Sequence, residues 1–443
     1  MEKTKVLELC KKEKIKFIHL QFSDLDGIVK SVEIPISQLS DTLEKGKWFD
    51  GSSIEGFARI AESDMFLQPD LLTFAIIPWD QEEGIKSARI ICDVMTPDKT
   101  PFIGDPRQIL KRNLLEIKKT GYEYFVGPEL EFFLFRKDDD GEIDLSPTDS
   151  AGYFDYSDDW ASVVRKEISN AAEQMGIEIE TVHHEVSTSQ HEIDFKYSNA
   201  LQAADNVITL KFIIKAIADR YGLHATFMPK PVFGINGSGM HVHQSLWKGG
   251  KNAFFSASDK YFLSTLAKQF IAGQLKEAPG ICAVTSPLVN SYKRLVPGYE
   301  APVYLSWARV NRSALIRIPR FSADNQSAAR IELRCPDPSC NPYLAFSAML
   351  LAGISGIKDK LDPPKPVEEN IYEMNDNQRK LRKIKTLPDS LGSALAVYEK
   401  SKLVELALGQ HIFDRLRESR RREWNEYRIR ISSWEEEAYL KKF

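Results

Sequence analysis

Pairs of charged side chains inside strongly apolar segments constrain this chain more than any other feature of its sequence. In GPELEFFLF, Glu129 and Glu131 are separated by one residue. Side chains alternate between the two faces of a strand, so both carboxylates leave one face while Leu130 and Phe132 leave the other. The surrounding Phe and Leu residues favour a buried strand over a solvent-facing edge strand. A buried carboxylate is costly unless it is paired or bound to metal, so this strand predicts a functional site.

The same period-two pattern recurs in NGSGMHVHQS and ARIELR, and HHEVSTSQHE adds two more carboxylates. Sites rich in oxygen ligands with few nitrogens select hard cations such as Mg²⁺ or Mn²⁺ over zinc. Five carboxylates balance two divalent ions to within one charge, whereas the bare cluster would repel itself. We therefore expect two divalent ions among Glu129, Glu131, Glu185, Glu192, Glu332 and the imidazole of His241.

Arginines are concentrated near the last of these motifs, at Arg294, Arg312, Arg317, Arg330 and Arg334. Guanidinium groups match the oxygens of carboxylates and phosphates bidentately, so arginines beside divalent ions suit a nucleotide and a carboxylate substrate. The chain contains no GxxxxGK[ST] motif, and NGSGMH does not fit the dinucleotide-binding fingerprint. Metal ions and arginines would therefore have to hold the phosphates.

Composition excludes several other classes of protein. The 59 Lys+Arg residues nearly balance the 63 Asp+Glu residues, which gives no global field for holding nucleic acid or an anionic membrane. The longest apolar stretches fall short of the ~18 to 20 residues of a membrane helix, and the N-terminus lacks the apolar core of a signal peptide. Five cysteines without a CxxC motif favour neither disulfides nor a zinc knuckle. We expect a cytoplasmic protein with reduced, mostly buried cysteines.

The order of predicted elements indicates two domains, at residues 1–104 and 105–443. The first hundred residues are predicted as strands at KFIHLQF, IVKSVEI, LLTFAIIPW and ARIICDV. A helix should follow, capped by Asp105, with Pro106 in its first turn and Gly121 at its end. Beyond it, strands alternate with helices expected at about 159–175, 200–221, 259–277 and 342–358, which indicates a mixed α/β catalytic part.

Taken together, the motifs resemble one family. FDGSSIEGF, GPELEFFLF, HHEV, NGSGMHVH, NSYKRLVPGYEAP, NRSALIRIP, RIELR and NPYLAF look like those of glutamine synthetases of the bacterial and archaeal type I, from about residue 15 to the C-terminus. The chain's length fits the shorter α-subtype. The resemblance implies an α+β fold: a small β-grasp-like N-terminal domain on a catalytic domain whose curved antiparallel sheet, backed by helices, forms an active-site funnel.

The resemblance also implies an activity and an assembly. ATP would phosphorylate the γ-carboxylate of glutamate, and ammonia would then displace phosphate to give glutamine. Similar proteins are dodecamers of two stacked hexameric rings, in which Asp50 of an adjacent chain binds and deprotonates ammonium. Glu300 would belong to a flap that shields the acyl phosphate, and Arg312 would stabilise the transferred phosphoryl group. The resemblance allows for nitrogen-regulatory proteins as partners.

Matching positions imply further roles for individual residues. One Mg²⁺ or Mn²⁺ ion would be held by Glu131, Glu185 and Glu192, and the other by Glu129, His241 and Glu332. Glutamate would contact Asn236, Gly237, Arg294, Glu300, Arg312 and Arg334. ATP would contact Tyr197, His243, Ser245, Arg312, Arg317 and Arg330. Arg59 would take part in feedback by glutamine.

Two segments depart from the family pattern. Ser189 stands where the family usually has Gly, and residues 321–329 do not match the usual pattern, which leaves nucleotide contacts there unassigned. Three other readings stay open: a ligase that joins glutamate to a larger amine, a catalytically silent homologue, and a two-metal phosphohydrolase. Asp50 favours ammonium, and the retained metal ligands argue against a silent protein. A phosphohydrolase would release phosphate from ATP without glutamate.

Overall fold

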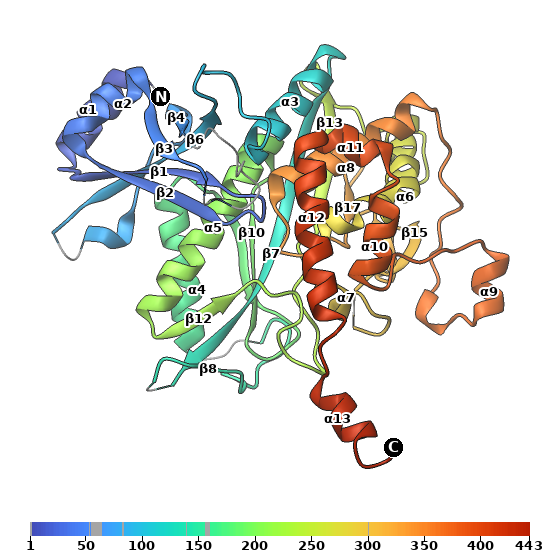
Figure 1. The fold of residues 1–443 in the computed structure, drawn as a ribbon. Helices are drawn as coiled ribbons and strands as arrows, with labels where there is room; N and C mark the ends of the chain where they lie inside the picture. Colours follow the sequence, from blue (N-terminus) through green and yellow to red (C-terminus); the bar gives the residue numbers. More distant parts are fainter. Residues whose placement is uncertain are drawn as a thin grey trace.

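The computed structural model describes residues 2–52, 54, 64–81, 84–138, 140–155, 160–299 and 301–443. Within these residues the chain forms a small sheet near the N-terminus and a larger sheet with helices packed against it (Figure 1). Separate hydrophobic cores support the two parts. The predicted boundary between residues 104 and 105 lies just before the first helix of the larger part.

The small sheet has the order β2-β1-β6-β4-β3, and β5 pairs with β6. Strands β1 and β6 are parallel, and the other pairs are antiparallel. The predicted strand LLTFAIIPW is wrong for most of its length, because Asp70 accepts from the backbone N–H of Leu72 and starts a 3₁₀ turn there. The elements are α1 (Lys3–Lys12), β1 (Phe17–Ser23), β2 (Val29–Pro35), α2 (Leu39–Lys45), β3 (Lys47–Asp50), β4 (Asp64–Pro69), β5 (Ala75–Ile76) and β6 (Ser87–Met95).

Helix α3 (Pro106–Lys119) leads into the larger part and begins as predicted. Asp105 caps it by accepting from the backbone N–H of Arg107 at 2.9 Å. Arg107 is buried and reaches acidic side chains of both parts of the chain. It donates to Asp93 of β6 at 2.6 Å. It also donates to Asp205 of helix α5 (Ala200–Arg220) at 2.8 and 2.9 Å.

The large sheet has the order β15-β16-β17-β13-β7-β10-β9; in addition, β8, β11 and β12 pair with β7, and β14 pairs with β13. Its centre is the 15-residue strand β7 (Glu123–Lys137). The sheet is mixed rather than purely antiparallel, because β15 and β16 run parallel. Its other strands are β8 (Ile143–Asp144), β9 (Ile179–His184), β10 (Gln190–Phe195), β11 (Ser198–Asn199), β12 (Leu223–Thr226), β13 (Val242–Lys248), β14 (Lys251–Asn252), β15 (Tyr304–Ala308), β16 (Ala314–Arg317) and β17 (Ile331–Leu333).

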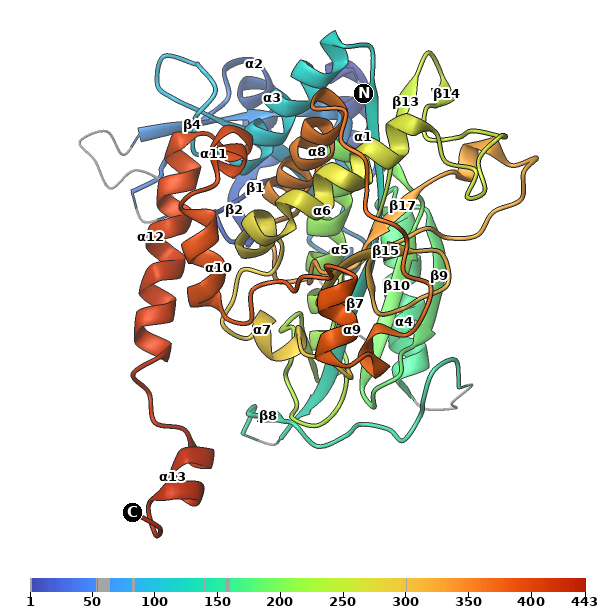
Figure 2. The same ribbon diagram turned by 90° about the vertical axis from the view of Figure 1, so that its right-hand side faces the viewer.

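Helices cover one face of this sheet, as Figures 1 and 2 show. The predicted helix at 259–277 starts six residues late, since Asp259 accepts from the backbone N–H groups of Tyr261 and Leu263 and holds a turn there. Ser264 then caps the helix. The helices are α4 (Trp160–Gln174), α5 (Ala200–Arg220), α6 (Thr265–Thr285), α7 (Ser291–Arg294), α8 (Pro342–Lys358), α9 (Asp376–Leu381), α10 (Leu391–Tyr398), α11 (Lys402–Leu408), α12 (Gln410–Tyr427) and α13 (Ser433–Tyr439).

Among the described helices, none combines the length and apolar character needed to cross a membrane. The five cysteines are buried and free, as the sequence predicted. Helix α13 extends away from the body of the molecule (Figures 1 and 2).

Candidate active site

Strand register places the charged side chains of the central strands opposite one another. Glu192 of β10 lies opposite Glu131 of β7, and Asp194 lies opposite Glu129. On the other side of β7, the backbone N–H of Glu129 donates to the carbonyl of His241 at 2.9 Å. The period-two pattern seen in the sequence therefore becomes a row of charges across neighbouring strands on the face that the helices leave open.

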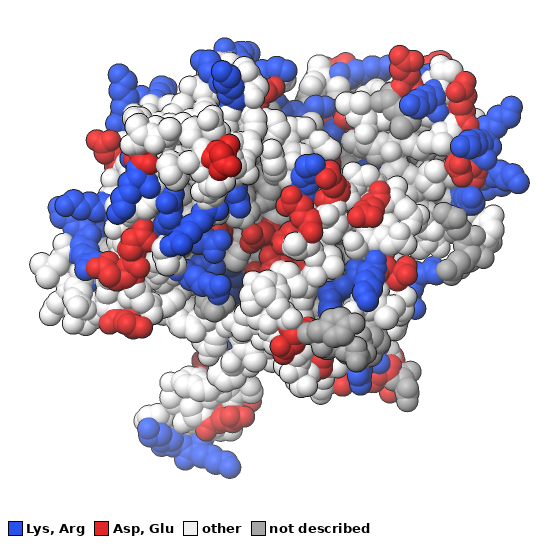
Figure 3. Space-filling model, turned by 180° about the vertical axis from the view of Figure 1, so that it is seen from behind, with Lys and Arg blue, Asp and Glu red and all other residues white. Residues whose placement is uncertain are grey.

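This open face holds a cavity of about 600 Å³. In the view from behind, acidic side chains gather near the middle of the surface with basic side chains beside them (Figure 3). All six predicted metal ligands line the cavity, which we call the first cavity: Glu129, Glu131, Glu185, Glu192, His241 and Glu332.

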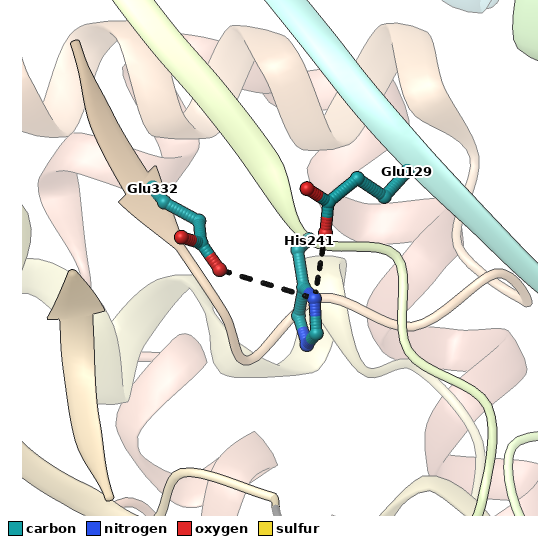
Figure 4. A group of neighbouring side chains, drawn as sticks. All are labelled: Glu129, His241 and Glu332. Atoms are coloured by element: carbon teal, nitrogen blue, oxygen red, sulfur yellow. Dashed lines mark hydrogen bonds and ion pairs between the residues drawn. The ribbon is translucent and has the colours of Figure 1, made fainter. Parts of the chain in front are cut away.

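Three of these ligands meet as the resemblance implied. His241 Nδ1 lies 2.9 Å from Glu129 Oε2 and 3.9 Å from Glu332 Oε1 (Figure 4). The potential ligand atoms all lie within 4.8 Å of one another. Glu332 Oε2 is buried without a well-directed hydrogen bond, although Arg317 Nε lies 2.7 Å from it. An oxygen in this position is suited to a cation.

The second cluster differs in one member from the predicted set. His183 lies 3.9 Å from Glu185 Oε1 and 3.6 Å from Glu192 Oε2, and the three could share an ion. The predicted third ligand, Glu131, lies in the same cavity but outside this group. Its Oε2 accepts from Gln190 Nε2 at 2.8 Å and from the backbone N–H of Gly239 at 2.9 Å.

Sequence reasoning missed His183 and Asp194. Each follows the spacing that found the others, because His183 lies two residues before Glu185 and Asp194 lies two residues after Glu192. Asp194 forms a third potential ligand group with Glu129 and Glu192. Extending the period-two rule by one step in each segment would have found both residues.

The carboxylates of the acidic cluster differ in the direction of their pKa shifts. Burial, together with the charge of Glu185, raises the pKa of Glu131 to about 8. Burial also raises the pKa of Glu192, with a contribution from its hydrogen bond to Glu185. Burial disfavours the charged form of Glu129 as well, but His243 and His241 hold its pKa well below the usual range. The cluster is therefore divided between carboxylates that are paired and carboxylates that need a cation.

The donors fit hard divalent ions. The two clusters that contain His241 and His183 each offer carboxylate oxygens with one imidazole, and no cysteine is among the described residues that line the cavity. Asp194 Oδ1 and Glu332 Oε2 are buried without hydrogen-bond partners. Mg²⁺ and Mn²⁺ prefer such oxygen-rich sites.

Groups that suit a carboxylate substrate line the same cavity. Arg294, only 3% exposed, is held by the carbonyls of Cys335 at 3.0 Å and Arg334 at 3.2 Å. Gly237 must be glycine, because a Cβ there would lie 2.1 Å from the carbonyl oxygen of Pro229. The cavity thus brings together all the predicted glutamate contacts that the structure describes: Asn236, Gly237, Arg294, Arg312 and Arg334.

A second cavity, of about 400 Å³, adjoins the first. It is lined by four of the residues predicted to contact ATP: Tyr197, His243, Ser245 and Arg330. The other two, Arg312 and Arg317, line the first cavity. Glu129, Thr181 and Asp194 line both and form a shared wall. Asn325, Ser327 and Ala328 also line the second cavity, so the segment that departs from the family pattern lies beside it.

Asp50 ends β3, is exposed and lines neither cavity. It accepts from the backbone N–H of Ser52 at 2.8 Å, and hydrogen bonding to Ser52 lowers its pKa. Glu300 and Arg59 lie outside the described residues.

The structure explains the departure at Ser189. This residue has a φ of 63°, in the left-handed region that favours glycine. Its buried hydroxyl accepts from the backbone N–H of Thr148 at 2.8 Å, and its own N–H donates to Asp149. These bonds hold the hairpin between Glu185 and Glu192 in place despite the missing glycine.

The fold, and a site in which two adjoining cavities share a wall with candidate metal ligands, define a divalent-metal-dependent ligase. Residues 103–439 match the family model described as glutamine synthetase, catalytic domain, and residues 14–97 match its β-grasp domain. The chain belongs to the glutamine synthetase family.

Relatives match along nearly the whole chain. A glutamine synthetase of Clostridium saccharobutylicum is 52% identical over 442 residues, covering 100% of this chain and 99% of that protein. One of Methanosarcina mazei is 51% identical over 439 residues, covering 99% and 97%.

Two solved structures share the fold. Glutamine synthetase of Plasmodium falciparum, solved by cryo-electron microscopy, has a TM-score of 0.89 at 28% identity and covers 99% of each chain. A GmaS/ADP complex has a TM-score of 0.88 at 29% identity and covers 98% of this chain and 99% of that chain.

These matches confirm the predicted fold and activity. The protein forms glutamine from glutamate and ammonia at the expense of ATP, and it uses divalent metal ions. It acts as a homo-oligomer. The β-grasp domain predicted for the N-terminal part is confirmed by the match to residues 14–97.

Proposed function

We propose that the two side-chain clusters of the first cavity hold the two divalent ions of the ligase. One ion would take Glu129, His241 and Glu332. The other would take Glu131, Glu185 and Glu192, with His183 as a neighbouring donor. Both described hydrogen bonds of Glu131 go to Oε2, which leaves its Oε1 for an ion. When bound, the ions neutralise phosphate charge and orient the triphosphate.

The remaining groups of the first cavity would position glutamate. Arg294 and Arg334, with Asn236 and Gly237, would bind its charged ends, and its γ-carboxylate would face the shared wall. The γ-carboxylate oxygen attacks the γ-phosphorus of ATP, the bond to the β-phosphate oxygen breaks, and ADP leaves. Arg312 and Arg317 would stabilise the charge that develops on the transferred group. Ammonia then displaces phosphate from the acyl phosphate.

The second cavity would hold the nucleotide. Tyr197, His243, Ser245 and Arg330 line it, and we assign them to ATP. His243 is held against Glu129 at 2.7 Å, and this carboxylate counteracts burial and raises the pKa of His243.

Asp50 and Glu300 would complete the site after assembly. We propose that Asp50 of a neighbouring chain binds and deprotonates ammonium, and that Glu300 shields the intermediate from water. Exposure of Asp50 and its absence from both cavities support a role toward another chain. The assembly would be a dodecamer of two hexameric rings.

Other finer assignments rest on the resemblance. We propose feedback by glutamine through Arg59, regulation by nitrogen-regulatory proteins, and a domain boundary between residues 104 and 105. The buried, free cysteines suit a reducing compartment, so we propose a cytoplasmic location.

The register of β17, β13, β7 and β10 carries the metal assignment, and a titration with Mn²⁺ tests it. The wild type should bind two ions per chain. Glu332→Gln should lose one ion, Glu185→Gln should lose the other, and each should abolish most glutamine synthesis. His183→Ala tests the difference between the predicted and observed groups. If either Glu332→Gln or Glu185→Gln still bound two ions with wild-type affinity, the assignment would be refuted.

A steady-state assay separates the ligase from the other readings. Phosphate release should require both glutamate and ammonia for full rate, and diamines should not replace ammonia. Release of phosphate from ATP alone at the full rate would mark a phosphohydrolase.

A further inference from the structure

Lys230 is a nearly buried lysine without a carboxylate partner among the described residues. It is 9% exposed, and burial lowers its pKa. Its ammonium donates to the carbonyl of Ile235 and lies 3.9 Å from the centre of the Tyr299 ring. A buried ammonium costs free energy that one carbonyl and one aromatic face offset only partly. Stability alone gives little reason for a lysine here.

The backbone of Lys230 is fixed to the segment that carries Arg294. Its N–H donates to Asn290 Oδ1 at 2.7 Å, and its carbonyl accepts from Asn290 Nδ2 at 3.0 Å. Asn290 directly precedes α7, which ends at Arg294. One side chain thus ties the loop at Lys230 to the start of the helix that presents Arg294 to the first cavity.

The side chain of Lys230 supports the loop that carries Asn236 and Gly237. Its bond to Ile235 lies one residue before Asn236. A Cβ at Gly237 would lie 3.3 Å from Lys230 Cδ, so the aliphatic stem packs directly against that glycine. The ammonium then reaches Tyr299, which also lines the first cavity.

We propose that Lys230 is a positioning residue for glutamate. It is the joint at which three segments of the glutamate-binding side of the cavity meet: the loop with Asn236 and Gly237, helix α7 with Arg294, and the segment with Tyr299. The inference rests on the proposed assignment of these groups to glutamate. Lys230 itself does not line the cavity and acts through its neighbours.

The test replaces Lys230 with Met, which keeps the stem and removes the charge. The Michaelis constant for glutamate should rise at least about tenfold, because the loop before Asn236 and the segment with Tyr299 lose the ammonium that joins them, while the backbone bonds to Asn290 remain. The Michaelis constant for ATP should stay within about twofold, and the melting temperature should stay the same or rise, because the buried charge has no carboxylate partner. A lysine with only a structural role would lower the melting temperature and leave the glutamate constant unchanged.

Two further variants test the route through Tyr299. Tyr299→Phe keeps the ring that the ammonium faces, so adding Lys230→Met to it should raise the glutamate constant by the same factor as Lys230→Met does in the wild type. Tyr299→Leu removes the ring, and adding Lys230→Met to Tyr299→Leu should raise the glutamate constant by less than the product of the two single effects. Independent, multiplicative effects would overturn the coupling. If Lys230→Met fails to fold, the two Tyr299 variants still decide whether the contact controls glutamate binding.

Lys248→Met is the matched control. The ammonium of Lys248 lies 4.9 Å from the centre of the Tyr122 ring. Lys248 is the last residue of β13, at the end remote from His241, and it lines neither cavity. The Michaelis constants of Lys248→Met should be unchanged, and a rise in its glutamate constant equal to that of Lys230→Met would overturn the proposal.

Arg294→Gln separates the assignment of the pocket to glutamate from the role of Lys230. If Arg294→Gln leaves the glutamate constant unchanged, the assignment of the pocket is wrong; if it raises the constant and Lys230→Met does not, only the role of Lys230 is wrong.

Discussion

At Gly239, the absence of a side chain leaves room for both a proposed metal ligand, Glu131, and a proposed glutamate-binding residue, Arg294. A Cβ there would lie 2.5 Å from an Nη atom of Arg294 and 3.2 Å from Glu131 Oε1. Arg294 is held by backbone carbonyls and cannot move aside freely. Gly239→Ala should therefore reduce metal affinity and activity by about 10- to 100-fold, as other changes behind ligands do.

Titration with Mn²⁺ and the Michaelis constant for glutamate measure this effect. Gly280→Ala, in helix α6 and outside both cavities, is the control and should leave both values unchanged. Wild-type metal affinity in Gly239→Ala would contradict the prediction.

The pair His184 and Asp149 should make stability depend on pH. His184 Nε2 lies 3.0 Å from Asp149 Oδ1, and the pair is buried. Burial opposes the charged imidazole, but the Asp149 hydrogen bond and charge outweigh it and raise the pKa of His184. The pair's contribution is full below the unfolded pKa of about 6.5 and is lost as pH rises through the higher folded pKa.

Denaturant unfolding of the metal-free protein between pH 6 and pH 9 checks this. Asp149→Asn should lower the free energy of unfolding by about 1.5 to 3 kcal/mol at low pH, with a smaller loss at high pH. The pair of His19 and the exposed Glu33 provides the control, since Glu33→Gln should change stability by less than about 1 kcal/mol. A loss in Asp149→Asn that does not vary with pH would contradict the assignment.

At the residue scale, much of the site follows from spacing. Period-two alternation identified Glu129, Glu131 and His241, because a strand forces such residues onto one face. The same alternation could not show that His183, rather than Glu131, forms a group with Glu185 and Glu192. That grouping depends on the bend of the hairpin at Ser189, which only the folded backbone defines.

Helices α6 and α8 cross in backbone contact. A Cβ at Gly273 would lie 2.2 Å from the carbonyl oxygen of Ala352 and 2.6 Å from the backbone nitrogen of Gly356. Backbone atoms cannot rotate away as a side chain can, so Gly273→Ala must push the helices apart. We expect a loss of about 1 to 3 kcal/mol in the free energy of unfolding, as for other overpacked cores.

Gly280→Ala in the same helix is the control for this prediction. Its nearest neighbour would be Ser401 Oγ at 3.1 Å, and a small side-chain shift accommodates the methyl group. The gain in helix propensity, about 1 kcal/mol, should offset that shift. Denaturant unfolding measures both variants. If Gly273→Ala were as stable as Gly280→Ala, the close approach of α6 and α8 would not require a glycine at position 273.

At the element scale, the sequence predicted which helices and strands form better than it predicted where each one begins and ends. Helix α8 has the predicted bounds, since its capping residue Asn341 and following Pro342 mark the start. Helix α6 does not, because the side chain of Asp259 competes for backbone N–H groups that periodicity assigns to a helix. The parallel pair β15 and β16 was also missed, since alternation within a strand carries no information on the direction of its neighbour.

For the whole molecule, the hydrophobic pattern predicted a small and a large part but not how they join. The centre of the large sheet, β7, contacts strands from distant parts of the sequence, and no local signal ranks those partners. The β-grasp domain and the assembly came from resemblance to a family. The ionic network at Arg107 was likewise invisible, because its acidic partners are spread from Asp70 to Asp205.

Arg107 should therefore control the stability of the junction. It contacts Asp70, Asp93 and Asp205 at 2.8, 2.6 and 2.8 Å, and the charge and hydrogen bond of Arg107 lower the pKa of Asp70 against the effect of burial. Arg107→Met would leave these carboxylates without their shared cation. The free energy of unfolding should fall by about 3 to 5 kcal/mol at pH 8.

The pH dependence of this loss distinguishes charge from packing. Without Arg107 the buried carboxylates have higher pKa values than in the unfolded chain, so the variant should regain stability as pH falls and they take up protons. In the wild type, the contribution of Asp70 is present above its unfolded pKa of about 4 and is lost only below it. The difference between Arg107→Met and wild type should thus be smaller at pH 5 than at pH 8 in denaturant unfolding, with the exposed Lys118→Met on the same helix as control. A difference that is the same at both pH values would mean that Arg107 stabilises the junction through its packed stem, and that the acidic partners on the two sides contribute little.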